Sequence, residues 1–262
     1  METLKDLVAD TRAYEGTAID FPSRAAPYTY SDFAGSVWKS GNLLGHYGVH
    51  PGAAVTVVFG PKSQTVESDS GQIDAADSIF ALLGATLLGG RVHLTPQEPV
   101  ESRALVVPII DVDRYETRPG CTRVVYGGVP EDPAVVHFEQ EMWSENPIEP
   151  PEPVEPDDPA IVIGENVLTH AELLSAATDF VESYELTAGD RVVLDAPLDE
   201  SGSILAVLGT IAVGATLVIP EADSATDSDY AGKVVVTTAD RSADRFVTVE
   251  TLSERLHDIR RA

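Results

Sequence analysis

The sequence has very little of several features that would each point to a particular class of protein. Its only cysteine is Cys121, so neither an intrachain disulfide nor a cysteine-ligated metal cluster can form. Lysine is also scarce, and occurs only as Lys5, Lys39, Lys62 and Lys233. The first residues lack the apolar core of a signal peptide, and no apolar run approaches membrane-spanning length. The sequence therefore predicts a soluble, cytoplasmic protein with no membrane partner.

Positive charge is scarce relative to negative charge along the whole chain. There are 43 Asp and Glu against 17 Lys and Arg in 262 residues, a formal net charge of -26, and the pI is near 4.3. This balance argues against a nucleic-acid partner, which would require a cationic face. The acids are scattered, so a disordered acidic tail does not explain them. Because about 1 M salt shortens the Debye length to about 3 Å, we expect an acidic surface suited to a salt-accumulating cytoplasm, as in a halophile.

Patterns that would mark a metal ion or a nucleophile are missing. His46 and His50 are the one histidine pair at ligand spacing, but the turn at Gly48 keeps them from sharing a helical face. No G-x-S-x-G turn exposes a serine. The glycines around Gly84 and Gly209 precede predicted strands, whereas those of dinucleotide-binding loops follow a strand. We therefore predict no metal, no cofactor and no catalytic residue.

Helices and strands are predicted to alternate, in the same order in both halves of the chain. In the first half, helices are expected at 31–47 and 75–88 and strands at 53–59 and 91–94. In the second half, helices are expected at 169–184 and 201–213 and strands at 160–163, 191–194 and 215–219. Such alternation is typical of parallel βαβ units. The predicted fold class is α/β, with two similar lobes of mostly parallel βαβ units.

Two pairs of passages are also alike residue by residue. Residues 29–58 resemble 168–195, and residues 78–96 resemble 203–221. One interpretation is an internal duplication or a pseudo-symmetric layout. The other is that any doubly wound sheet yields such similarity, because buried helices and strands use the same few residue types. The sequence leaves both open.

A segment rich in proline and acid separates the two halves. Residues 143–159 read WSENPIEPPEPVEPDDP. Proline removes an amide donor and fixes its backbone angle, so neither a regular helix nor a central strand is expected there. We predict a first α/β lobe at 1–143, a linker at 144–159 and a second α/β lobe at 160–262.

Several short motifs follow one another in a fixed order. In the first half they are Thr29-Tyr30 at a helix start, the Gly-Val-x-Pro-Gly turn at 48–52 and the glycines at 84, 89 and 90 before Arg91-Val92. In the second half they are DDPAI at 157–161, LTHAELL at 168–174, Asp190-Arg191, DAPL at 195–198 and GATLV at 214–218. In this order they resemble the adenylate-forming (AMP-binding) acyl-CoA synthetase superfamily. The resemblance covers only the N-terminal part of such an enzyme, and it implies the fold of its N-terminal subdomains.

The chain departs from that family where ATP would be bound. The resemblance implies a Ser/Thr/Gly-rich loop ending in Pro-Lys-Gly, whose amides and hydroxyls hold the phosphates. Here only VIGENV remains at 162–167, with one glycine and a carboxylate at Glu165. A displaced phosphate loop at 60–63, with Lys62, Thr65 and Ser68, is a less favoured alternative because it lacks the glycine spacing that turns amides inward.

Other parts of the family pattern are missing as well. The stretch Pro197-Leu198-Asp199 lacks the aromatic-His pair that the family often uses to shape its acyl pocket. The sequence ends about where the family continues to its adenine-binding strand, its ribose-binding Asp and its C-terminal domain with a catalytic Lys, so no residue is assigned to those roles.

Thr169 and His170 are the most family-like pair, and the resemblance implies that they bind a cofactor, beside a nucleotide or acyl group. A local interpretation is favoured. Thr169 and Glu172 form a T-x-x-E capping box, which contributes about 0.5 to 2 kcal/mol to the helix. His170 is then expected as an exposed residue of the first turn.

Two functional hypotheses follow. The first is a truncated acyl-CoA synthetase-like protein of a halophile that is catalytically inactive and acts as a binding or regulatory partner of another protein, or of itself. The second is a surviving enzyme of the acid-thiol ligase type that binds acyl-CoA or a nucleotide at the carboxyl ends of its strands. A decaying gene product that folds and does little is a third possibility.

Overall fold

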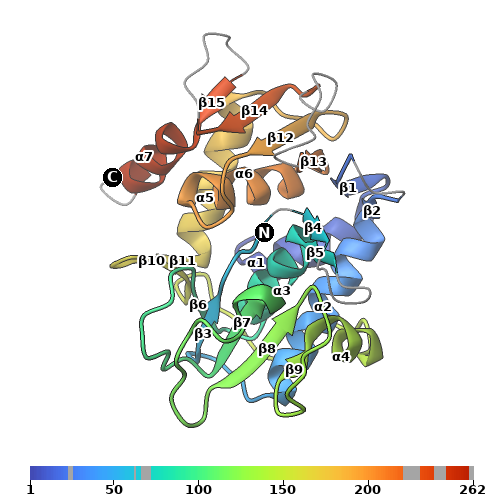
Figure 1. The fold of residues 1–262 in the computed structure, drawn as a ribbon. Coiled ribbons are helices and arrows are strands. Elements are labelled where there is room, and N and C mark those ends of the chain that lie inside the picture. Colours follow the sequence, from blue (N-terminus) through green and yellow to red (C-terminus); the bar gives the residue numbers. More distant parts are fainter. Residues whose placement is uncertain (23–25, 62, 66–71, 221–230, 239–245, 260–262) are drawn as a thin grey trace. The chain divides into compact units, whose positions relative to one another are not determined.

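The chain folds into two compact units, each with its own sheet. The structure, a computed structural model, describes residues 1–22, 26–61, 63–65, 72–220, 231–238 and 246–259 (Figure 1). Unit 1 combines Met1–Phe33 with His170–Ala262, and unit 2 is Ala34–Thr169. This division differs from the predicted lobes, because each half of the chain contributes strands to the sheet of the other half.

Unit 2 is built on a seven-stranded sheet with the order β11-β10-β6-β3-β7-β8-β9. Its strands are β3 (Ala54–Val57), β6 (Arg91–His93), β7 (Ala104–Pro108), β8 (Thr122–Tyr126), β9 (Val136–His137), β10 (Pro159–Ile163) and β11 (Asn166–Thr169). All neighbours are parallel except the β10–β11 hairpin. Every residue of β7 is buried, as expected for a central parallel strand whose two faces are both covered. A separate two-stranded ribbon pairs β4 (Ser63–Thr65) with β5 (Gln72–Asp74).

The helices of unit 2 are α2 (Tyr30–His46), which begins in unit 1, α3 (Ala75–Leu87) and α4 (Phe138–Ser144), with a short 3-10 turn η2 (Ile109–Asp111). Every residue of α3 is buried, in agreement with the predicted apolar helix. Asp74 opens α3 by accepting a hydrogen bond from the amide of Ala76 at 2.9 Å. The helices α2 and α3 cross closely, since a Cβ added to Gly84 would lie 2.7 Å from the nitrogen of Gly41.

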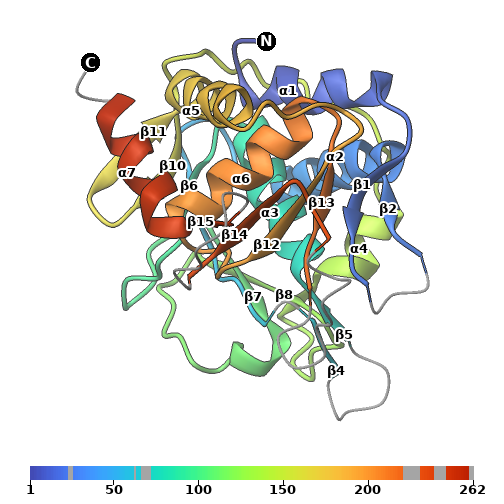
Figure 2. The ribbon, with the colours of Figure 1, turned by 90° about the horizontal axis from the view of Figure 1, so that it is seen from above.

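Unit 1 is built on a six-stranded sheet with the order β15-β14-β12-β13-β1-β2. Its strands are β1 (Thr17–Asp20), β2 (Tyr28–Thr29), β12 (Arg191–Asp195), β13 (Thr216–Val218), β14 (Val234–Thr237) and β15 (Phe246–Thr248). Its helices are α1 (Leu4–Asp10), the 3-10 turn η1 (Thr11–Ala13), α5 (His170–Ser183), α6 (Ser201–Ala212) and α7 (Val249–Ile259). The helices α5, α6 and α7 pack together on one side of this sheet (Figures 1 and 2).

The two sheets repeat one pattern. Outward from the hairpin, the order β2-β1-β13-β12-β14-β15 corresponds to β11-β10-β6-β3-β7-β8. Backbone hydrogen bonds between strands also match. The bond from Arg91 N to Ala53 O (2.8 Å) in unit 2 corresponds to that from Thr216 N to Asp190 O (2.9 Å) in unit 1. Likewise, the bond from Arg103 N to Ala54 O (2.7 Å) corresponds to that from Lys233 N to Arg191 O (2.8 Å). Both hairpins also carry a register shift near their start. Shared composition alone does not place hydrogen bonds at matching positions, so the structure favours a pseudo-symmetric layout and confirms the predicted α/β fold with two similar lobes.

The exchange of hairpins explains why the predicted boundaries differ from the observed units. The β1–β2 hairpin pairs with β13 in unit 1 but leads into α2, most of which belongs to unit 2. The β10–β11 hairpin pairs with β6 in unit 2 but leads into α5 of unit 1. Residues 144–159, predicted as a linker, lie within unit 2. A boundary drawn from proline content cannot anticipate strand partners that lie far away in sequence.

Candidate functional site

The position at which the resemblance predicts a phosphate-binding loop is a tight hairpin turn. Ile163 of β10 pairs directly with Asn166 of β11, and Val162 pairs with Val167. Only Gly164 and Glu165 are left between the paired residues, and Gly164 adopts a φ of 59°, which a two-residue hairpin turn favours. Successive amides of a phosphate-binding loop must point into one concavity, and a two-residue turn has too few of them to surround a phosphate.

The side chains of this turn are also unsuited to phosphate. Glu165 is exposed, and its carboxylate repels an anionic ligand. The neighbouring Leu168 is buried, which holds the hairpin in its register because a slip by one residue would expose it. The segment 162–167, where the resemblance predicts a phosphate-binding loop, thus forms a tightly paired hairpin.

Thr169 and His170 lie at the junction of β11 and α5. Thr169 is half-buried and pairs with Pro159, whereas the side chain of His170 is fully buried. His170 Nδ1 accepts a hydrogen bond from the amide of Leu4 at 3.1 Å. The expectation that His170 is an exposed first-turn residue is therefore wrong, because a contact 166 residues away in sequence covers it. The capping box of Thr169 with Glu172 stays a prediction.

The corresponding junction in unit 1 shows a similar arrangement. Thr29 and Asp32 form a reciprocal cap, in which the Asp32 amide donates to Thr29 Oγ1 at 3.1 Å and the Thr29 amide donates to Asp32 Oδ2 at 3.1 Å. Tyr30, which corresponds to His170, is buried and donates from its hydroxyl to the carbonyl of Ala215 at 2.6 Å. Burial raises the pKa of Tyr30. The buried side chain at each junction thus ties the helix start to a distant segment of unit 1.

At the alternative phosphate loop after β3, the amide of Gly60 already has a protein partner. The Gly60 amide donates to the Tyr126 hydroxyl at 2.7 Å, and that hydroxyl donates to the carbonyl of Val58 at 2.9 Å. The Gly60 amide therefore already has a protein acceptor and is not turned toward a ligand. Lys62 and Ser68 lie outside the described residues.

The carboxylate of Glu139 lies at the carboxyl end of β8, which ends at Tyr126. Glu139 of α4 accepts a hydrogen bond from the amide of Gly127 and lies 3.3 Å from His137 Nε2. Burial raises the pKa of the Glu139 carboxyl, while the Gly127 hydrogen bond and the His137 charge oppose that rise. These contacts fix α4 to β8. Among the described residues no group of three or more His, Cys, Asp or Glu could hold a metal ion.

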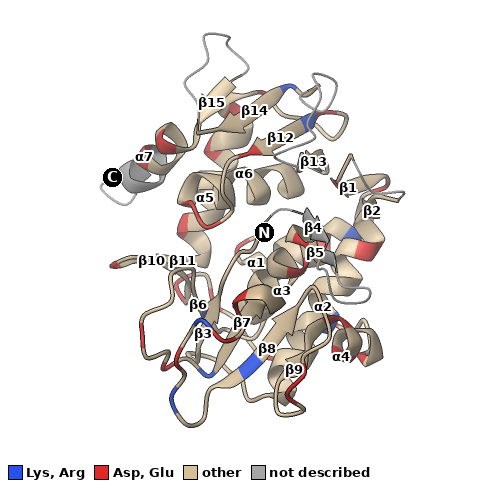
Figure 3. Ribbon diagram, in the orientation of Figure 1, with Lys and Arg blue, Asp and Glu red and all other residues tan. Residues whose placement is uncertain are grey.

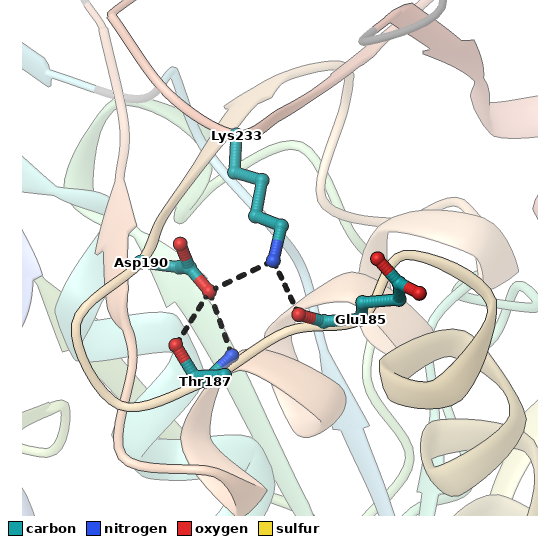
Figure 4. Close-up of polar contacts among 4 residues, drawn as sticks. All are labelled: Glu185, Thr187, Asp190 and Lys233. Carbon is teal, nitrogen blue, oxygen red and sulfur yellow. Dashed lines mark hydrogen bonds and ion pairs between the residues drawn. The ribbon is translucent and has the colours of Figure 1, made fainter.

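One polar cluster in unit 1 closes the end of α5 (Figure 4). Lys233 Nζ donates to the carbonyl of Glu185 and lies 3.2 Å from Asp190 Oδ2, which also accepts from the amide and hydroxyl of Thr187 at 2.7 and 2.8 Å. Burial acts to raise the pKa of Asp190, but the Thr187 hydrogen bonds and the Lys233 charge outweigh it and lower that pKa. Glu185 has a positive φ of 49°, so a cation at its carbonyl stabilises an unusual helix end.

Unit 2 has a matching cation at the end of α2. Arg103 donates from Nε to the carbonyl of Tyr47 at 3.0 Å and from Nη1 to the carbonyl of Gly120 at 3.2 Å. Gly48, which corresponds to Glu185, has a φ of 83°. Both clusters are therefore parts of the repeated fold. The sequence alone does not predict them, because the two cations follow their helices by long stretches of chain.

Comparison with solved structures identifies the fold. The chain is similar to the N-terminal domain of FACL13 from Mycobacterium tuberculosis, with a TM-score of 0.67 and 18% identity over 87% of this chain and 59% of that chain. It is also similar to a benzoate CoA ligase from Burkholderia xenovorans, with a TM-score of 0.69 and 17% identity over 90% of this chain and 50% of that one. It is also similar to the anthranilate CoA ligase AuaEII, solved with anthranoyl-AMP, with a TM-score of 0.70 and 17% identity over 90% of this chain and 49% of that chain.

The chain spans about half the length of these solved structures. No protein-family model and no curated protein matches the sequence. No helix among the described residues is long and apolar enough to cross a membrane. The strand order, the repeated units and these structural similarities together show that the chain has the fold of the N-terminal part of adenylate-forming acyl-CoA and aryl-CoA ligases.

Proposed function

We propose that this chain is an acyl-CoA synthetase-like protein that does not form acyl-adenylates and acts as a binding or regulatory partner of another protein. The observation that carries the proposal is the two-residue turn Gly164-Glu165, which lies where the resemblance implies a phosphate-binding loop. A triphosphate requires several inward amides or a cation for charge neutralisation, and this turn offers an exposed carboxylate instead. A salt-rich cytoplasm, suggested by the net charge of -26, belongs to the same proposal.

The alternative is a ligand-binding enzyme of the acid-thiol ligase type. It is supported by the fold, since one structure similar to this chain is a CoA ligase solved with an acyl-adenylate. In that case Thr169 and His170 would be the positions that contact the nucleotide. The full burial of His170, together with its hydrogen bond to Leu4, favours a structural role for it instead.

The proposal is tested by calorimetric titration of the purified protein with ATP, AMP and an acyl-CoA in molar KCl. We expect no ATP binding below 1 mM, because nothing at the Gly164-Glu165 turn replaces the phosphate loop. A pyrophosphate-release assay with ATP, CoA and a panel of carboxylic acids serves as the second readout, with a benzoate CoA ligase as the positive control. Submillimolar ATP binding or acid-dependent pyrophosphate release would refute the proposal and favour the ligase alternative.

A further inference from the structure

The last two residues of α4 and the first part of the predicted linker lie along α2, and residues 143–150 are called the strap here. Lys39 Nζ donates to the carbonyl of Trp143 at 3.3 Å. Asn42 Nδ2 donates to the carbonyls of Asn146 and Ile148 at 3.1 and 2.8 Å. One turn further, His46 Nδ1 lies 2.9 Å from Glu145 Oε1. Positions 39, 42 and 46 fall on one face of a helix, so a single face of α2 holds the strap through its backbone and through the Glu145 side chain.

Two prolines of the strap fit against glycines of α2. A Cβ added to Gly41 would lie 2.9 Å from Pro150 Cγ, and one added to Gly35 would lie 3.7 Å from Pro147 Cβ. Pro150 is buried as a result. Because proline restricts the backbone and α2 supplies the hydrogen bonds, the strap is pre-organised, and ordering it costs a binding partner little entropy.

This fixed backbone presents two large apolar side chains to solvent. Trp143 is 74% exposed and Ile148 is 64% exposed, whereas the other tryptophan, Trp38, is 6% exposed. Lys39 Nζ lies 5.1 Å from the centre of the Trp143 ring and steadies it. Tryptophan is the residue type that most often carries binding energy in protein interfaces, so an exposed tryptophan on a strap held by hydrogen bonds indicates a docking surface.

The charge around this pair selects the kind of partner. Exposed carboxylates lie on both sides of Trp143 and Ile148 in sequence, at Glu141 of α4 and at Glu149. A second copy of this chain carries the same net charge of -26. Carboxylates brought into direct contact repel one another even where salt shortens the Debye length to about 3 Å, so like charges oppose self-association through this surface. A partner with lysine or arginine around an apolar groove would meet both the charge and the exposed side chains.

We propose that Trp143 and Ile148 on the strap form the docking surface for a basic protein that presents an apolar groove with a cationic rim. This inference rests on the proposed role as a protein partner and specifies the surface and the chemistry of that partner. The apolar side chains supply affinity, and the surrounding carboxylates supply orientation and selectivity.

The surface can be tested with designed peptides in place of the natural partner. A fluorescent amphipathic helical peptide of Leu and Lys mimics a basic, apolar partner, and a Leu and Glu peptide of equal length is its charge control. Binding is followed by fluorescence anisotropy at moderate and at molar KCl. We expect the Leu/Lys peptide to bind, W143A and I148A each to weaken binding at least tenfold, and V129A, at a side chain 71% exposed elsewhere in unit 2, to leave it unchanged.

Three outcomes would overturn the inference: equal binding of both peptides at moderate KCl, unchanged binding by W143A, or light scattering that shows a dimer abolished by W143A. The last outcome would assign the surface to a second copy. Since W143A does not touch the Gly164-Glu165 turn, the absence of ATP binding is measured independently, and either proposal can fail alone. Photo-cross-linking from position 143 in native cells can then identify a partner, whose purified form should show the same loss with W143A.

Discussion

At the scale of single residues, a small number of cations perform well-defined structural tasks in a chain dominated by acids. Lys233 and Arg103 each close a helix whose end has a positive φ, at corresponding positions of the two units. The orphan carbonyls of a helix end carry partial negative charge, so a cation placed there stabilises the fold. These cations therefore stabilise the fold by their positions at helix ends more than by reducing the net charge.

We predict that K233M lowers the free energy of unfolding by about 0.5 to 1 kcal/mol, a value kept small because the side chain is partly exposed and screened. Urea unfolding at pH 7 measures the change. R118M is the matched control, since Arg118 pairs with Glu101 at 2.8 Å while both side chains are at least 60% exposed, and it should change stability by less. Equal losses in both variants would contradict the structural role of Lys233.

The same cluster gives a pH dependence whose sign is fixed. The pKa of Asp190 is lower in the folded protein than its usual value of 3.8, so the contribution of Asp190 to the free energy of unfolding is fully present above pH 3.8. That contribution is lost as the pH falls through the folded-state pKa, where the carboxyl becomes protonated. The stability difference between the native protein and K233M should therefore shrink in acid.

At the scale of elements, each unit contains a close helix crossing at a glycine. A Cβ added to Gly84 of α3 would lie 2.7 Å from Ser40 Oγ of α2. In the corresponding crossing of unit 1, a Cβ added to Gly209 of α6 would lie 2.6 Å from Phe180 Cδ1 of α5. Glycine is unfavourable inside a helix by about 1 kcal/mol relative to alanine, so close packing is the physical reason for its use here.

We predict that G84A and G209A each destabilise the protein by about 1 to 3 kcal/mol, because overpacking outweighs the gain in helix propensity. G45A in α2 is the matched control, since its added Cβ would meet Leu88 at 3.8 Å, an ordinary contact. That variant should be neutral or more stable by up to about 1 kcal/mol. Chemical denaturation of the three variants measures their free energies of unfolding. An unchanged value for G84A would contradict the prediction and show that α2 and α3 can move apart without a loss of stability.

At the scale of the whole molecule, the dominant feature is the excess of acidic residues, with 43 Asp and Glu against 17 Lys and Arg. Carboxylates are distributed over helices and loops of both units, with few cations between them (Figure 3). Self-repulsion among them opposes compact states at low ionic strength, and salt screens it.

We predict that the melting temperature rises steeply between low salt and molar KCl, because the Debye length falls to about 3 Å at 1 M. Circular dichroism at increasing KCl measures it. Potassium glutamate and sodium chloride at equal ionic strength are controls that separate screening from specific ion effects. A melting temperature insensitive to KCl would contradict the proposed adaptation to a salt-rich cytoplasm.

The sequence by itself determined the local elements and their order. The apolar run of α3, the glycine turn at 48–52 and the strands at 160–163 and 191–194 each carry their signal within a few residues. The sequence also shows directly that residues 162–167 are not a Ser/Thr/Gly-rich loop, since this is a property of consecutive residues. Patterns of this kind depend on local propensity and periodicity, which a linear sequence records directly.

Only the tertiary structure decided the grouping of the elements and the surroundings of individual side chains. It placed the β1–β2 and β10–β11 hairpins in exchanged sheets, buried His170 beneath Leu4, and bound the proline-rich strap to α2. Each of these results depends on hydrogen bonds and packing between residues that lie far apart in sequence. Their partners are selected when distant segments compete for the same sheet edge or helix face, and composition and periodicity contain no record of that competition.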